Sequence, residues 1–135
     1  MKIGRFVTAV AAVTTLSAVV NTIYYAVTAQ AHAWEATRSE PLFGLMMLNH
    51  VIFALLLTVL YPMMRRSATA RRDGFTFGAL MGLVMFVPTG LVVRAAWTVP
   101  LTALFAADIL FHALLTGVLG AVVALLLEPR TTAGA

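Results

Sequence analysis

This chain of 135 residues contains no cysteine and few charged residues. The lack of cysteine excludes disulfides, thiolate metal ligands and cysteine nucleophiles. Only 10% of the residues are charged, whereas soluble domains carry about 25%, and 61% of the residues are hydrophobic. A surface with so little charge is not stable in water, so lipid is the expected solvent for most of the chain.

Four long apolar segments follow one another, at about residues 6–30, 42–63, 74–97 and 101–127. About 20 apolar residues in a helix cross the ~30 Å hydrocarbon core of a bilayer. Strands are excluded because the segments are long, do not alternate, and would leave open sheet edges in lipid. We therefore predict one all-α membrane domain over residues 1–135, a four-transmembrane-helix bundle that contacts the lipid bilayer.

The basic residues flank the apolar segments. Only Arg38 and Arg94 would lie on one side of the membrane, and the other seven on the opposite side: Lys2, Arg5, Arg65, Arg66, Arg71, Arg72 and Arg130. The positive-inside rule then predicts a multi-pass protein of a bacterial-type inner (plasma) membrane with both termini cytoplasmic. Because the basic residues form no solvated stripe, no nucleic-acid partner is expected.

The N-terminal segment has two interpretations. Lys2 and Arg5, an apolar stretch and the sequence Ala29-Gln30-Ala31 also fit a signal peptide with a cleavage site. The apolar stretch is longer than a typical signal-peptide core, which favours a retained helix.

An internal similarity relates the second and fourth segments at a constant offset of 59 residues. Pro41-Leu42 matches Pro100-Leu101, and Asn49 matches Asp108. If real, the similarity indicates two tandem helical hairpins, a parallel repeat about an axis along the membrane normal. The alternative is coincidence between two apolar helices.

Small residues predict where the helices pack closely. Gly74, Gly78 and Gly82 are four residues apart and share one helix face, and Gly117 and Gly120 lie on a similar face of the fourth segment. Such faces let two backbones approach each other in lipid. The partner is either a neighbouring segment or another chain, so a homo-oligomer or a larger membrane complex is expected.

The first segment carries a polar stripe. Thr14, Asn21 and Thr28 recur every seven residues, with Ser17 and Tyr24 between them. A 3.5-residue period is the seam of a packed helix pair, so this stripe is expected to face the bundle interior and form hydrogen bonds between helices.

A layer of polar side chains is predicted in the outer half of the membrane. At ~1.5 Å per residue, one residue from each segment lies ~12–13 Å below the outer end: Asn21, His50, Thr89 and Asp108. His112 lies one turn deeper, Asn49 precedes His50, and Arg94 can pair with Asp108 or extend outward. We expect Asp108 to contact a histidine in this layer, and His32 to be solvated in the outer loop.

Several functions suit this polar layer. His50, His112 and Asp108 suit a divalent metal, and two histidines suit a haem. A histidine–aspartate pair suits proton transfer, and a structural hydrogen-bond cluster remains the simplest alternative. Catalysis is not expected, because the loops are too short to build a pocket. The chain is predicted to be an accessory or structural subunit of a membrane complex or a small transport component. The alternative is a metal- or haem-binding redox subunit.

Overall fold

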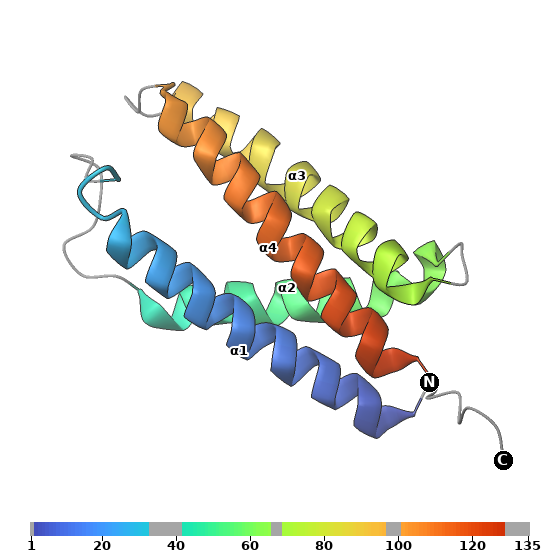
Figure 1. The fold of residues 1–135 in the computed structure, drawn as a ribbon. Coiled ribbons are helices and arrows are strands. Elements are labelled where there is room, and N and C mark those ends of the chain that lie inside the picture. The colour runs from blue at the N-terminus through green and yellow to red at the C-terminus, as the bar shows by residue number, and fades with distance from the viewer. Residues whose placement is uncertain (1, 33–41, 66–68, 97–100, 129–135) are drawn as a thin grey trace, which may run out of the picture.

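The computed structural model describes residues 2–32, 42–65, 69–96 and 101–128, and its regular structure there is entirely helical. The helices are α1 (Ile3–Val27), α2 (Phe43–Met64), α3 (Ala70–Ala96) and α4 (Ala103–Leu127) (Figure 1). All four are long and apolar enough to cross a membrane, which confirms the prediction of four apolar spans.

Three helix ends differ from the predicted bounds by three residues or more, and the first is the start of α1, at Ile3 and not at residue 6. α1 ends at Val27, and residues 28–32 continue as turns, with the His32 amide bonded to the Thr28 carbonyl. α3 begins at Ala70 and not at Gly74, so its first turn includes Asp73. An acidic side chain in the first turn interacts favourably with the exposed N–H groups of a helix, which explains the earlier start.

Large apolar side chains cover the outside of the bundle. Exposed residues occur along every helix, with exposed fractions of 81% for Val27, 77% for Met63 and 67% for Val84. The buried core is small by comparison and centres on Leu57, Tyr61 and Leu119. This distribution is the one expected for a multi-pass membrane protein, in which lipid covers the apolar exterior.

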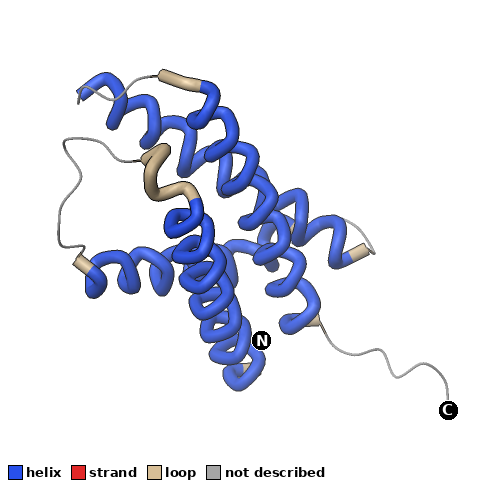
Figure 2. Tube along the Cα trace, turned by 60° about the vertical axis from the view of Figure 1, so that its left-hand side comes forward, coloured by secondary structure: helices blue, strands red, loops and turns tan. Residues whose placement is uncertain are grey.

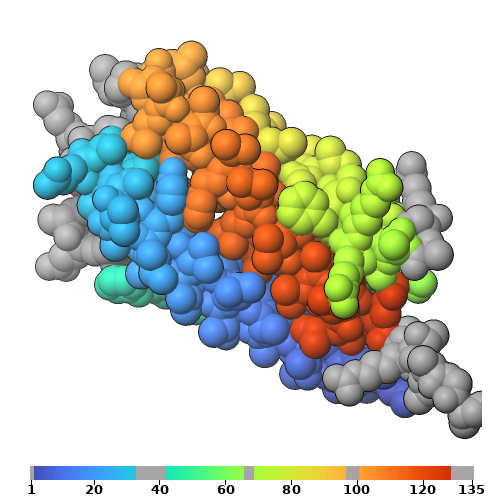
Figure 3. Space-filling view, in the orientation of Figure 1, coloured from blue at the N-terminus to red at the C-terminus, as the bar shows by residue number. Residues whose placement is uncertain are grey.

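α4 lies at the centre of the arrangement. On the face shown in Figure 3, α4 runs between α1 on one side and α3 on the other. α2 crosses behind the other helices (Figure 1) and packs mainly against α1.

The α3–α4 contact depends on glycine. A Cβ atom added at Gly78 would overlap the Thr116 carbonyl oxygen, and one added at Gly74 would overlap the Gly120 carbonyl oxygen. Gly82 meets the Thr116 side chain in the same way. The three glycines and the row formed by Thr116, Gly120 and Ala124 therefore allow the two backbones to touch.

Gly117 has a different neighbour from Gly120. A Cβ added at Gly117 would lie 2.8 Å from the Phe75 ring, whereas Gly120 meets backbone atoms of α3. The row with four-residue spacing thus continues from Gly120 to Thr116, and Gly117 lies beside this row.

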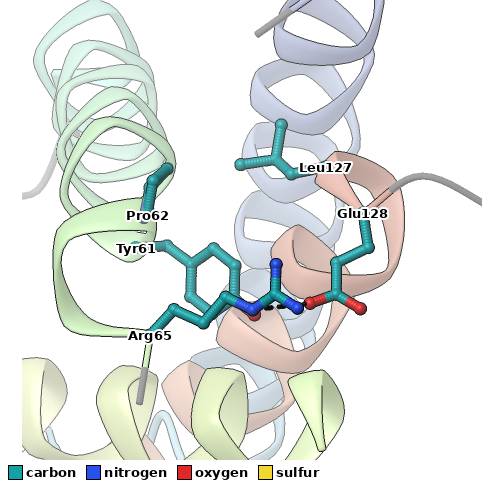
Figure 4. Close-up of a pocket in the computed structure, with 5 residues that line it drawn as sticks. All are labelled: Tyr61, Pro62, Arg65, Leu127 and Glu128. Atoms are coloured by element: carbon teal, nitrogen blue, oxygen red, sulfur yellow. Dashed lines mark ion pairs between the residues drawn. The ribbon is translucent and has the colours of Figure 1, made fainter. Parts of the chain in front are cut away.

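The basic end of the bundle is held by contacts to Glu128. The Arg5 guanidinium donates a hydrogen bond of 2.9 Å to the Glu128 carbonyl oxygen, and Arg65 Nε lies 3.2 Å from Glu128 Oε1. Figure 4 shows this ion pair at the mouth of a shallow pocket lined also by Tyr61 and Leu127. The start of α1 and the ends of α2 and α4 therefore lie at the same end of the bundle.

Candidate functional site

Asp108, on the second turn of α4, is the centre of a polar cluster at the opposite end. Its side chain is only 4% exposed. The Tyr24 hydroxyl of α1 donates a hydrogen bond of 2.6 Å to Oδ1. His32 Nε2 lies 3.0 Å from Oδ1 and 3.2 Å from Oδ2, and Arg94 Nη2 of α3 lies 4.0 Å from Oδ2. Three parts of the chain thus converge on one buried carboxyl group.

Packing fixes the position of the Tyr24 ring. The ring stacks on Phe111 of α4, with centroids 3.7 Å apart and planes 7° from parallel. One turn later, the Thr28 hydroxyl donates to the Tyr24 carbonyl oxygen, and His32 lies one further turn along. The spacing 24–28–32 therefore places the Tyr24 and His32 side chains on one side of the chain, toward Asp108.

The two ring nitrogens of His32 have different partners, and these partners fix where hydrogens are needed between His32 and Asp108. Nδ1 lies 3.0 Å from the Thr28 carbonyl oxygen, which can only accept, so Nδ1 carries a hydrogen and donates. A hydrogen bond between Nε2 and the Asp108 carboxyl group then requires one more proton, on the nitrogen or on the oxygen. The pair is therefore either an imidazolium with a carboxylate or a neutral imidazole with a carboxylic acid.

Arg94 sets the charge of the cluster. Its side chain is 9% exposed, donates 3.2 Å to the Gly90 carbonyl oxygen, and places its guanidinium 3.8 Å over the Phe105 ring. Arg94 is therefore held inside the bundle and does not extend outward. With the shared proton present the Asp108–His32–Arg94 group has a net charge of +1, and without it the group is neutral.

His112 and His50 have partners outside the carboxyl cluster. His112 Nδ1 donates 2.8 Å to the Asp108 backbone carbonyl oxygen, and the ring stacks on Phe86 of α3 with centroids 3.9 Å apart. His50 Nδ1 lies 3.1 Å from the Ser17 hydroxyl of α1. Asn21 donates to the Ser17 carbonyl oxygen. His50 and Ser17 thus link α1 to α2 at a separate place.

The structure does not bring the predicted layer together as one cluster. Asp108 and Arg94 meet, and His112 adjoins them through the backbone, but His50 and Asn21 form the separate contact with Ser17. Asn49 and Thr89 are exposed on the outside of the bundle. Equal depth does not fix the direction in which a side chain points, which explains the difference.

The expectation that His32 is solvated is wrong, because its side chain is 10% exposed and contacts Asp108. The polar stripe of α1 could have predicted the inward position of His32, since Tyr24, Thr28 and His32 are each four residues apart. Extending the stripe by one turn would have reached His32.

The three residues considered for a metal do not form a ligand set. His50, His112 and Asp108 have the separate partners described above. Across residues 2–32, 42–65, 69–96 and 101–128, no group of three or more His, Asp or Glu side chains is arranged to hold a metal ion. The arrangement is instead that of one buried carboxyl group with a tyrosine hydroxyl, a histidine and an arginine beside it.

No protein-family model, curated protein or solved structure matches the chain. The four apolar helices found among the described residues are those of a multi-pass membrane protein.

Proposed function

We propose that this protein is a small transport component of a bacterial-type inner membrane in which Asp108 and His32 bind and release a proton. The contact between His32 Nε2 and the Asp108 carboxyl group carries the proposal, because it requires one shared proton. Ionisable groups inside a membrane bundle commonly mark proton or ion pathways. Binding of the proton changes the charge of the cluster by one unit, and the Arg94 charge sets the two values at neutral and +1.

The proposed route of the proton to Asp108 follows from the positions of the polar residues along α1 and the turn after it. His32 lies beyond the end of α1, next to the outer side of the membrane in the proposed orientation, and exchanges the proton there. Tyr24, which bonds to Asp108, lies eight residues before His32 in the chain. Ser17 and His50 form the next polar pair toward the basic end of the bundle. Seven residues of helix, about 10 Å, separate Tyr24 from Ser17, so direct transfer between them is excluded and the proposed path requires water molecules there.

Proton flux into vesicles tests the transport function. Protein reconstituted into vesicles that contain a pH-sensitive dye is expected to acidify the interior when a potassium diffusion potential is applied. Asp108→Asn should reduce the flux to that of protein-free vesicles, because an amide cannot exchange this proton. Asp73→Asn, the same change at the other end of the bundle, should retain the flux. A folded wild-type protein without flux would contradict the proposal and favour an accessory-subunit role.

The orientation is also proposed, from the position of the basic residues. Arg5, Arg65 and the first turn of α3 lie at the end of the bundle that the Glu128 contacts define. By the positive-inside rule this end, with both termini, faces the cytoplasm. Reporter fusions at Ala70 and after Ala135 are then expected to report the cytoplasm, and a fusion at Ser39 the outside. A cytoplasmic signal at Ser39 would contradict the orientation.

A further inference from the structure

α2 exposes a continuous seam on the side opposite the face that it buries. The buried residues of α2 are Ala54, Leu57, Thr58 and Tyr61. Six of its exposed residues, called here the α2 seam, are spaced alternately four and three residues apart: Leu45, Asn49, Ile52, Leu56, Val59 and Met63. At 100° per residue the seam is centred about half a turn away from the buried face. The same spacing is that of the contact seam between two helices in a coiled coil.

Asn49 is the only polar residue of the α2 seam, and lipid cannot satisfy it. It lies seven residues after Leu42, about 10 Å along the helix, and its side chain is too short to reach the interface. Among the described residues, none forms a hydrogen bond with the Asn49 amide. A carboxamide without partners is strongly unfavourable in hydrocarbon. The group that covers this part of α2 must therefore offer both a donor and an acceptor.

We propose that the α2 seam packs against the α2 seam of a second copy of this chain, with the two Asn49 amides hydrogen-bonded to each other. A carboxamide donates and accepts, so two copies satisfy each other. Both copies insert in the same orientation, so a rotation axis along the membrane normal makes the two helices parallel and places Asn49 opposite Asn49. A single Asn in an otherwise apolar parallel seam is known to fix register between helices.

The bundle leaves room for this contact. Residues 42–49 are all exposed, and Figure 2 shows the start of α2 extending away from the other helices. A second α2 can therefore approach without displacing α1 or α4. The Asp108 cluster is built from α1, α3, α4 and the turn after α1, so self-association through α2 is independent of the proposed proton site.

Disulfide trapping tests the contact directly, because the natural chain has no cysteine. Ile52→Cys and Leu56→Cys, which keep Asn49 in place, should give covalent dimers on mild oxidation in native membranes. The control is Leu110→Cys, at similar depth on α4 and 61% exposed, which should remain monomeric. Equal trapping at Leu110→Cys and Ile52→Cys would overturn the proposal, since it would indicate random collision.

The role of the amide needs a second measurement. Energy transfer between labelled copies in vesicles should show self-association of the wild type. Asn49→Ala should weaken it about tenfold, as expected for loss of a hydrogen bond between membrane helices. Leu110→Ala should leave it unchanged, and unchanged circular dichroism would show that both variants fold. A monomeric wild type, or an Asn49→Ala variant that associates as strongly as the wild type, would overturn the proposal.

Discussion

Gly78→Ala is expected to destabilise the protein by about 3 kcal/mol or more, although it adds a single methyl group. The added Cβ would overlap the Thr116 carbonyl oxygen and lie 2.9 Å from the Thr116 carbonyl carbon. These atoms are backbone, so no side-chain rotation can relieve the overlap. α3 must move away from α4, and the contacts at Gly74 and Gly82 weaken with it.

Gly44→Ala is the matched control, since a Cβ at Gly44 meets no atom within 4 Å. It should be neutral or slightly stabilising, because alanine favours helix by up to about 1 kcal/mol over glycine. Reversible unfolding in mixed detergent micelles, followed by circular dichroism, compares the two variants. If Gly78→Ala unfolds at the same denaturant concentration as the wild type, α3 and α4 do not pack through this face.

Asp108→Ala is expected to lower the free energy of unfolding by about 3–5 kcal/mol. The change removes the carboxyl group that accepts from Tyr24, contacts His32 and faces the Arg94 charge. Buried polar groups that lose such a contact cannot regain it from lipid. Asp108→Asn should be less harmful, about 1–2 kcal/mol, because the amide oxygen still accepts from Tyr24.

The same unfolding assay separates these outcomes. Asp73→Ala, in the first turn of α3, removes an acidic side chain outside the cluster and should cost less than Asp108→Ala, because Asp73 is less deeply buried. Equal losses for Asp108→Ala and Asp73→Ala would show that the Asp108 contacts add no special stability. The smaller loss in Asp108→Asn also makes this variant the suitable one for vesicle measurements.

The four apolar helices could be predicted from the sequence because hydrophobicity and length are nearly sufficient for a membrane span. The glycine spacing at 74, 78 and 82 predicted a close helix contact, since close approach depends on the absence of a side chain. The row on α4 that meets these glycines was harder to predict, because Thr116 is not among the smallest residues. Its hydroxyl bonds to the His112 carbonyl oxygen 2.6 Å away and so packs close to its own helix.

The cluster around Asp108 could be predicted only in part. Depth along a helix indicated that Asp108 needs a polar neighbour, but the rotation of each helix decides which residue supplies it. Thr89 and His50 have a similar depth and point elsewhere. His32 was missed because it lies beyond the last apolar turn, where a solvated loop is the usual expectation. The predicted repeat between the second and fourth segments stays a prediction, and its paired positions differ, with Asn49 exposed and Asp108 buried.

We propose that Asp108 and His32 share one exchangeable proton inside the bundle. Infrared difference spectroscopy between acidic and alkaline pH measures this directly, through the carbonyl stretch of a protonated carboxyl group and the ring modes of histidine. We predict a pH-dependent signal that Asp108→Asn abolishes, His32→Ala shifts, and Asp73→Asn leaves in place. Identical difference spectra for the wild type and Asp108→Asn would contradict the claim, because the proton would then titrate elsewhere in the protein.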